Sequence, residues 1–389
     1  MILLRHARCT FNHASIIHHS TRRYTSTKIS DPLRILFCGS DPFSITSLDA
    51  LYLEKQKYPD SIKSIDVVCR PPKHVGRGLK KLQEPPIAGK ARAFSLPLHQ
   101  IDAFKGWSAP LADGEPINLI VAVSFGLFVP PRILDAAKYG GLNVHPSLLP
   151  DFRGAAPLHH TLLAGCTRTG VTLQTLDTQR FDHGLILDQT PQPGFDIPNP
   201  DSISASELTD FVAPIAAEML VRGIRNRVYA HSPPEIYNAS NISRSGGIRT
   251  AKKIVTEDRR VNWPVWTSDY ILRRQRVLGP LWNEAILNHD KCLEPRKRIL
   301  WGSGFRRPLA GPEQLPPGFA AVATGAGNDT SIYIGTKDGH VLQVDEISVD
   351  GQKVSSARMA AVKNDFLDLN KLEELGSSNA YTRLQGEFF

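Results

Sequence analysis

The sequence predicts an α/β protein in which an open, mostly parallel sheet is followed by a small β-barrel. Residues 117–123 are almost continuously apolar, as expected for a central strand that is buried on both faces of a parallel sheet. Beyond residue 297, short β-type runs are separated by Gly and Asp turns, a pattern that is typical of a compact β domain. The chain has 389 residues, 41% of them apolar, so it is long enough for two domains with separate cores.

The strands of the predicted sheet are short apolar runs that end in Gly, Pro or polar residues. They are expected at 34–39, 65–69, 96–99, 117–123, 142–144, 170–175 and 185–189. Helices should connect them, at 41–53, 86–94, 131–137, 153–163 and 206–224. The first helix begins near Pro42, since proline is favoured in the first helical turn. The last helix has a core-facing stripe of apolar residues at a spacing of three and four, and Pro214 should kink it.

A strand followed by glycine and a helix also opens dinucleotide-binding domains. Here Gly39 is the only glycine between Arg34 and Asp60. The G-x-G-x-x-G fingerprint that brings the backbone close to a pyrophosphate is therefore absent. The sequence disfavours NAD and FAD as ligands.

A change in composition marks the predicted domain boundary. Residues 231–247 are rich in Pro, Ser, Asn and Gly, which is typical of a linker. We therefore expect a sheet domain at 31–232, a linker at 233–250 and a C-terminal domain at 251–389. The C-terminal domain should contain a helix at 269–278 and strands at 298–301, 319–324, 331–335 and 341–349.

Residues 1–30 differ from the rest of the chain. They hold five cations and no acid, and many of the other residues are Ser, Thr and His. The cations are Arg5, Arg8, Arg22, Arg23 and Lys28. This composition predicts a mitochondrial transit peptide, with a disordered basic tail as the alternative. The segment around Arg22-Arg23-Tyr24 resembles a matrix-peptidase site with cleavage after Tyr24, so the mature protein is expected in the mitochondrial matrix.

The remaining positive charge is concentrated in one region. The whole chain carries +8, and the five cations of residues 1–30 leave about +3 for the mature part. Residues 251–310 contain 13 Lys and Arg but only 6 Asp and Glu. A local basic face of this kind is typical of a nucleic-acid-binding surface.

Other classes of protein are disfavoured by the composition. No run of 18 or more apolar residues occurs, so the sequence predicts no membrane span. The five cysteines are scattered, without a Cys-x-x-Cys pair or the spacing of a metal site. Free thiols of this kind suit a reducing compartment, and we expect no bound metal.

Three polar residues between 141 and 184 could perform acyl-transfer chemistry. Asn143 and His145 are two positions apart in a predicted strand, so their side chains should face the same way. Asp182 follows in a predicted loop. An amide and an imidazole can stabilise an oxyanion, while a carboxylate can orient the imidazole or accept a proton. An incidental Asn-x-His pair and an ordinary Asp-containing turn are the structural alternatives.

Four motifs in a fixed order resemble the formyltetrahydrofolate-dependent formyltransferases. They are N-V-H-P-S-L-L-P at 143–150, R-G-A-A-P at 153–157, G-V-T at 170–172 and D-H-G at 182–184. The likeness is greatest to the branch that formylates the methionyl group carried by initiator tRNA. It is good over 34–184, and thin but continuous after 250. The chain departs from the family at G-S-D-P-F, 39–43, where members have a Gly-Thr-Pro-x-Phe turn, and at His183, where many members have a small residue.

The resemblance implies a Rossmann-like formyltransferase domain, an OB-like barrel, and 10-formyltetrahydrofolate as a co-substrate rather than a bound cofactor. It implies that Asn143 and His145 hold the oxyanion and that Asp182 pairs with His145. The implied folate-binding residues are Ser124, Phe125, Gly126, Leu127, Val129, Ser147, Leu148, Leu149 and Pro150. The tRNA-binding candidates are Arg77, Lys80, Lys81, Arg153, Arg273, Arg274 and Arg276. We expect a monomer.

Two other functions are compatible with parts of this pattern. One is a formyltransferase for a small amine, or a hydrolase that releases formate; the basic region 251–310 and the basic loop around Arg77 disfavour it. The other is a non-catalytic RNA-binding module, which the intact Asn143, His145 and Asp182 disfavour.

Overall fold

The computed structural model describes residues 30–230, 247–286, 297–302, 304–323, 330–364 and 381–388. The chain divides after Asp31 into two units, and the described helices and strands all belong to the second unit, which begins at Pro32. All but the last residue of the predicted transit peptide, 1–30, and most of the predicted linker, 233–250, lie outside the described residues. Within the described part of the chain, no helix is long and apolar enough to cross a membrane.

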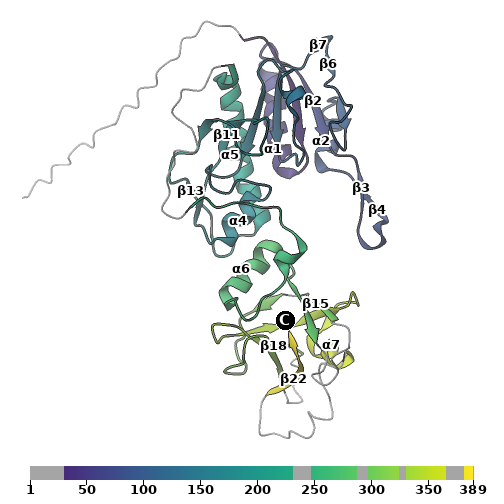
Figure 1. The fold of residues 1–389 in the computed structure, drawn as a ribbon, viewed down its shortest axis with the longest axis vertical. Coiled ribbons are helices and arrows are strands. Elements are labelled where there is room, and N and C mark those ends of the chain that lie inside the picture. The colour runs from purple at the N-terminus through teal and green to yellow at the C-terminus, as the bar shows by residue number, and fades with distance from the viewer. Residues whose placement is uncertain are drawn as a thin grey trace, which may run out of the picture. The chain divides into compact units, whose positions relative to one another are not determined.

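Within the described residues, seven strands form the central sheet (Figure 1). Their order is β12-β11-β9-β8-β1-β2-β5. They are β1 (Leu33–Gly39), β2 (Ile62–Cys69), β5 (Leu98–Gln100), β8 (Leu119–Val123), β9 (Gly141–His145), β11 (Thr172–Thr175) and β12 (Ile186–Gln189). Pairing is parallel from β5 to β9, and β11 is antiparallel to both of its neighbours. The predicted α/β class with a mostly parallel sheet is confirmed.

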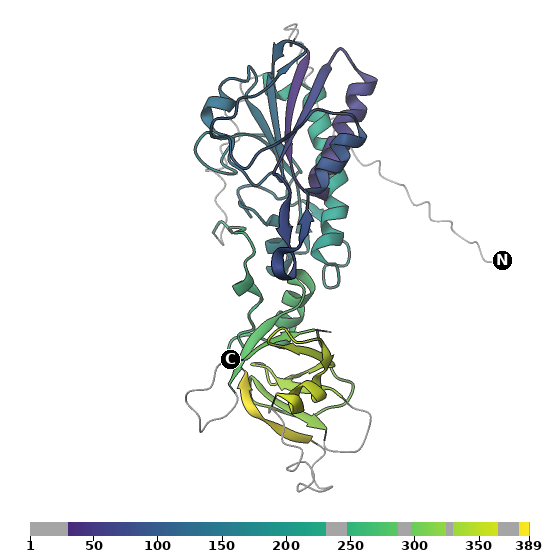
Figure 2. The same ribbon diagram turned by 90° about the vertical axis from the view of Figure 1, so that its right-hand side faces the viewer.

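Helices cover one face of this sheet (Figure 2, purple and teal). They are α1 (Pro42–Lys57), α2 (Pro86–Ala93), α4 (Pro157–Leu163) and α5 (Ala205–Arg225). Side chains along β1 point alternately to the two faces of the sheet. Leu33, Ile35 and Phe37 pack against these helices, and Leu36 and Cys38 contact the layer on the opposite face. That second layer contains α3 (Pro131–Leu134) and the loops around it. Both faces are thus buried, which explains the continuous apolar runs.

The predicted helix at 153–163 begins later than expected. Its first residue is Pro157, because the preceding segment is paired with the chain that follows the linker. Three backbone hydrogen bonds of 2.7 to 3.2 Å join 152–156 to 249–251. Arg249 also forms an ion pair of 2.7 Å with the buried carboxylate of Asp151. Residues 151–156 therefore form a loop that a distant part of the sequence holds in place.

The C-terminal part forms a small β domain, as expected. Its described strands make one antiparallel sheet of nine, in the order β16-β19-β18-β17-β22-β14-β15-β20-β21. They are β14 (Trp282–Ile286), β15 (Lys297–Trp301), β16 (Phe305–Arg306), β17 (Phe319–Ala323), β18 (Ile332–Gly335), β19 (Val341–Val344), β20 (Glu346–Val349), β21 (Ser355–Ser356) and β22 (Tyr381–Phe388). The predicted run 341–349 is two strands, and β14, β16, β21 and β22 were not predicted. Helices α6 (Ser268–Leu278) and α7 (Ala357–Lys363) accompany the sheet.

Aromatic side chains fill the core of this β domain. Trp263 and Trp301 are fully buried and meet edge to face, with ring centroids 6.0 Å apart. Phe305 packs against both rings. Such pairs bury large apolar areas, so the small domain has a core of its own.

Short elements complete the described fold. The two-stranded pairs are β3 (Lys73–Val75) with β4 (Lys81–Gln83), β6 (Leu111–Ala112) with β7 (Glu115–Pro116), and β10 (Arg168–Thr169) with β13 (Phe195–Asp196). The 3₁₀ turns are η1 (Arg77–Leu79), η2 (Val228–Ala230) and η5 (Thr256–Arg259). The β3–β4 hairpin extends away from the sheet (Figure 1).

Candidate active site

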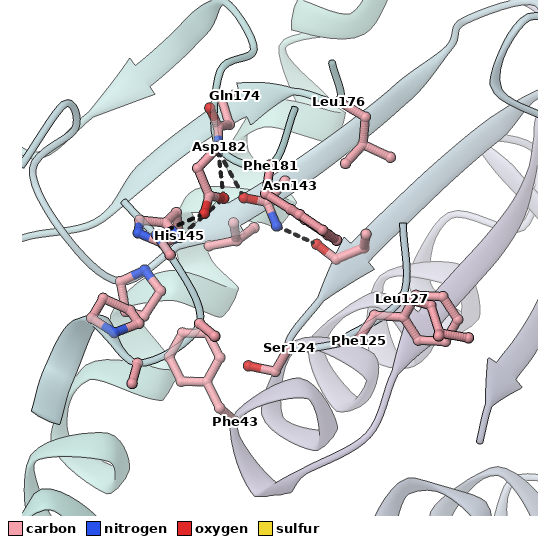
Figure 3. A pocket seen from close by; sticks show the side chains of 18 of the residues that line it. Phe43, Ser124, Phe125, Leu127, Asn143, His145, Gln174, Leu176, Phe181 and Asp182 are labelled. Carbon is pink, nitrogen blue, oxygen red and sulfur yellow. Dashed lines mark hydrogen bonds and ion pairs between the residues drawn. The ribbon is translucent and has the colours of Figure 1, made fainter. Parts of the chain in front are cut away.

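The three predicted polar residues come together at the carboxyl end of β9. Asn143 and His145 lie on this strand two positions apart. Asp182 lies in the loop between β11 and β12, and its Oδ1 is 3.3 Å from Nδ1 of His145 (Figure 3). The two other parallel-strand ends nearby, after β1 and β8, are joined by a hydrogen bond from Ser40 Oγ to the Phe125 carbonyl. This edge is where open α/β sheets bind ligands.

His145 is buried and both of its ring nitrogens face acceptors. Nδ1 faces the Asp182 carboxylate, and Nε2 lies 2.9 Å from the backbone carbonyl of Phe152. Because neither partner can donate, both nitrogens are best satisfied when each carries a hydrogen, as in an imidazolium. Burial lowers the pKa of His145, but the charge of Asp182 and the hydrogen bonds to Asp182 and to the Phe152 carbonyl together outweigh burial, and the net pKa is raised.

Asp182 is held as a carboxylate by donors on both of its oxygens. The Gly154 N–H donates to Oδ2 at 3.1 Å, and Gln174 Nε2 donates to Oδ1 at 3.2 Å. Burial raises the pKa of Asp182, but the charge of His145 and the hydrogen bonds to the carboxylate have the larger effect. The net pKa of Asp182 is therefore lowered. The backbone of Asp182 has a φ of 56°, a left-handed conformation that aspartate tolerates better than most residues.

The amide of Asn143 has a defined orientation. Its Oδ1 accepts a hydrogen bond of 3.0 Å from Gln174 Nε2, and its Nδ2 donates one of 3.0 Å to the Ala122 carbonyl. An amide nitrogen carries two hydrogens, so Nδ2 can make a second donation. Since Asn143 lines the cavity described below, that donation is available to a ligand.

We expect NMR titration to give His145 a pKa above its ordinary value of 6.5, because the Asp182 pairing and the Phe152 hydrogen bond together outweigh burial. In Asp182→Asn the pKa should fall below 6.5, since burial remains and the negative charge is gone. His159 is an internal reference, as burial and neighbouring cations lower its pKa in both proteins. A His145 midpoint below 6.5 in the unmodified protein would contradict the pairing.

The same pair makes stability depend on pH. The raised pKa of His145 adds stability that is complete below 6.5 and is lost as pH rises through the folded value. The lowered pKa of Asp182 adds stability that is complete above 3.8 and is lost as pH falls through the folded value. The pair therefore contributes most between pH 3.8 and 6.5.

A cavity of about 450 Å³ opens beside these side chains. Five of the predicted folate-binding residues line it: Ser124, Phe125, Gly126, Leu127 and Val129. The other four, Ser147, Leu148, Leu149 and Pro150, do not line its described wall. They form a buried turn behind His145, in which Ser147 Oγ donates to the Asp151 carbonyl at 2.6 Å. At this position they can hold His145 in place, but they do not reach a ligand in the cavity.

Sequence reasoning missed several residues of the cavity. Phe128 and Phe181 meet edge to face at its wall, with centroids 5.3 Å apart. Phe43, at the start of α1, is buried and lines the cavity. Gln174 could not be found from a motif, since its place opposite Asn143 depends on the antiparallel register of β11 with β9.

The tRNA-binding candidates fall into two groups. Lys80 and Lys81 are exposed at the β3–β4 hairpin, and Arg77 begins the η1 turn between its strands. Three of the other four, Arg153, Arg274 and Arg276, make contacts that hold the fold together. Arg153 Nε donates to the Asp182 carbonyl at 2.8 Å, and Arg276 donates to the carbonyls of residues 200 and 201.

Arg274 is the most buried of these arginines and makes several contacts within the domain. It is only 9% exposed, and its guanidinium lies 4.5 Å from the Trp266 ring centroid. It also donates to the Tyr270 hydroxyl at 2.8 Å and to the Asp258 carbonyl. This placement favours packing over contact with phosphate. Arg273, which is half-buried, is the better placed of the three α6 arginines.

Comparison with known proteins gives the class first. The model of the formyl transferase family matches residues 33–210, the part of the chain that contains the central sheet, the cavity and all three polar residues. The fold and the match together define the class as formyl transferase.

Relatives of similar sequence identify the family within the formyl transferases. The chain is 34% identical over 299 residues to the mitochondrial methionyl-tRNA formyltransferase of Saccharomyces cerevisiae, covering 67% of this chain and 72% of the relative. It is 32% identical over 342 residues to the methionyl-tRNA formyltransferase of Syntrophus aciditrophicus, covering 87% and 97%. The mitochondrial enzyme of Mus musculus is 30% identical over 303 residues, covering 76% and 72%. The chain belongs to the methionyl-tRNA formyltransferase family.

Proposed function

We propose that this enzyme transfers the formyl group of 10-formyltetrahydrofolate to the α-amino group of methionyl-tRNA, to start translation in mitochondria. Family membership supports the reaction, and the cavity supports the site. The observation that carries the proposal is the convergence of Asn143, His145 and Asp182 at one wall of that cavity. The folate is consumed in each cycle, so it acts as a co-substrate.

In the proposed mechanism the methionyl amine attacks the formyl carbon. The carbonyl electron pair moves to oxygen, and a tetrahedral intermediate forms. Asn143 donates its second Nδ2 hydrogen to this oxyanion, and the charged imidazole of His145 stabilises the negative charge. The C–N bond to the folate N10 then breaks, the oxygen pair reforms the carbonyl, and tetrahydrofolate leaves.

Proton movement accompanies these steps. The attacking amine must lose one proton, and the departing N10 must gain one. Asp182 is an ionised carboxylate beside His145, so we assign it the transfer of this proton, directly or through water. Until Asp182 accepts that proton, its negative charge keeps His145 protonated, which preserves the cation beside the developing oxyanion.

The direct test is formyl transfer from 10-formyltetrahydrofolate to charged initiator tRNA by the purified mature protein. The expected product is N-formylmethionyl-tRNA together with stoichiometric tetrahydrofolate. Charged elongator tRNA and free methionine should be poor acceptors. Release of formate without acceptor would favour a hydrolase, and equal use of free amines would favour a small-molecule formyltransferase.

We propose that the β3–β4 hairpin and the start of the C-terminal domain bind the tRNA. Exposed cations are present in both, including Lys80 and Lys81 in the first and Lys252, Lys253 and Arg259 in the second. Phosphate contacts release condensed counterions, so binding should weaken steeply as salt is added.

Arg77→Ala is expected to lower the formylation rate at saturating tRNA more than it lowers tRNA affinity. The hairpin belongs to the domain that carries the cavity, so its role would be to seat the acceptor end, and misplacement by about 1 Å can be costly in rate. Rates and affinities should be compared across salt concentrations. Lys57→Ala, which removes an exposed cation at the end of α1, is the control. If Arg77→Ala weakened tRNA binding but left the rate at saturating tRNA unchanged, the proposed role of the hairpin in positioning the acceptor end would be wrong.

We further propose that the enzyme works as a monomer in the mitochondrial matrix after removal of a transit peptide. The composition of residues 1–30 supports this, and two relatives are named as mitochondrial. N-terminal sequencing of protein purified from the organelle should begin near Thr25. An intact Met1 in the organelle would contradict it.

A further inference from the structure

We infer that Gln174 is a positioning residue that fixes the amide of Asn143 and the carboxylate of Asp182 in one geometry. The inference rests on the proposed function of those two residues. Gln174 lies on β11 directly opposite Asn143 in the antiparallel register with β9. Facing residues of paired strands project from the same side of the sheet, so the side chain reaches the site although it belongs to none of the motifs.

The chemistry of its neighbours determines which way the Gln174 amide points. Nε2 lies 3.0 Å from Asn143 Oδ1 and 3.2 Å from Asp182 Oδ1, and Figure 3 shows both interactions as dashed lines. Asp182 can only accept, so the donor nitrogen must face it. An amide oxygen at this place would oppose a carboxylate. Gln174 therefore donates one hydrogen to each neighbour.

The first donation decides what Asn143 presents to the cavity. With Oδ1 engaged by Gln174, the nitrogen of Asn143 is turned towards the Ala122 carbonyl and the ligand space. Rotation of the Asn143 amide by half a turn would place an acceptor there instead. An acceptor would repel an oxyanion, so Gln174 selects the productive orientation.

The second donation acts on the oxygen of Asp182 that faces His145. Oδ1 receives Gln174 Nε2 and His145 Nδ1, while Oδ2 receives the Gly154 N–H. Donors on both oxygens hold the plane of the carboxylate and favour its ionised form. Loss of Gln174 should thus loosen Asp182 and raise its pKa.

A third observation separates this side chain from ordinary core packing. Gln174 is 1% exposed, and its Oε1 has no hydrogen-bond partner among the described residues. Burying an unsatisfied amide oxygen is unfavourable, and such groups are few in native proteins. An apolar residue would avoid that cost. The two hydrogen bonds that Gln174 donates therefore explain why a glutamine occupies this buried position.

Gln174→Met is the main test, because methionine keeps the length of the side chain but cannot donate. We expect kcat to fall about 10- to 10²-fold, as misplacement of a reacting group does, with the KM for both substrates changed less than about twofold. The acid limb of the kcat profile should move to higher pH, because Asp182 loses a donor. Gln174→Glu should be worse at neutral pH, since its carboxylate would face Asp182.

Gln343→Met is the matched control. Gln343 is also buried in a sheet, and its Nε2 also donates twice, to Ser331 Oγ and to the carboxylate of Asp345. Its loss should cost comparable thermal stability but leave kcat and the pH profile unchanged. Wild-type kcat and profile in Gln174→Met would overturn the inference. So would a loss of kcat with an unshifted profile.

Carbon-13 NMR of labelled aspartate gives a readout that needs no substrate. The Asp182 carboxyl should titrate at higher pH in Gln174→Met than in the wild type, whether or not the wild type formylates tRNA. An unchanged Asp182 midpoint would refute the positioning role by itself. Absence of formyl transfer by the wild type would refute the proposed function, so the two failures are distinguishable.

Discussion

Replacing Asp182 with asparagine is expected to lower the turnover of formyl transfer by at least about 10²-fold, a loss comparable to that of an oxyanion-hole donor. In the wild type three donors converge on the carboxylate, from Gly154, Gln174 and His145. An asparagine offers one oxygen, so its NH₂ must face a donor. The imidazole of His145 then loses both its orientation and the charge that keeps it protonated.

The measurement is single-turnover formylation with saturating folate and tRNA, which isolates the chemical step. Asp196→Asn is the control, because it removes a carboxylate that pairs with Arg168 on the surface at 3.0 Å. That variant should retain full turnover. Activity of Asp182→Asn near that of the wild type would remove Asp182 from the mechanism.

Asn143→Ala is expected to lower turnover by about 10²- to 10³-fold, as loss of an oxyanion donor does. The interaction strengthens only as charge develops on oxygen. Turnover and kcat/KM should therefore fall together, while binding of the folate changes little. The truncation also leaves Gln174 without one acceptor, which adds disorder at Asp182.

Asn118→Ala controls for the loss of a hydrogen-bonded asparagine in the same domain. Asn118 is buried and makes two hydrogen bonds, to the Arg34 N–H and the Pro32 carbonyl. It lies before β8, at the opposite end of the strand from the cavity. Its replacement should lower thermal stability but leave turnover intact below the melting temperature. Equal turnover losses in both variants would mean that Asn143 acts through stability.

Local sequence was enough to predict the strands of the central sheet and the pairing of two site residues. A strand buried on both faces is continuously apolar, as in β8, and the alternation of side chains along β9 placed Asn143 and His145 together. The class of the fold follows from such runs. The motif carrying Asp182 located the third residue of the site, although the loop that presents it has no periodicity.

Features that depend on distant partners could not be predicted. Gln174 reaches the site through strand register, and the start of α4 is delayed by pairing with 249–251. Three arginines on α6 looked like one basic patch. Residues one apart on a helix point in different directions, and Arg274 turns inwards to the aromatic rings of Trp266 and Tyr270.

Because the 151–156 loop is attached to 249–251, the site can be completed only after synthesis has passed residue 251. The Phe152 carbonyl and the Gly154 N–H, which contact His145 and Asp182, belong to this loop. A nascent chain that has emerged only as far as residue 232 lacks the 249–251 segment that fixes the loop. The formyltransferase half should thus collapse around its sheet early yet stay catalytically incompetent. Proteolysis between residues 232 and 249 would remain harmless while the two fragments stay bound, because the hydrogen bonds that matter lie beyond the cut.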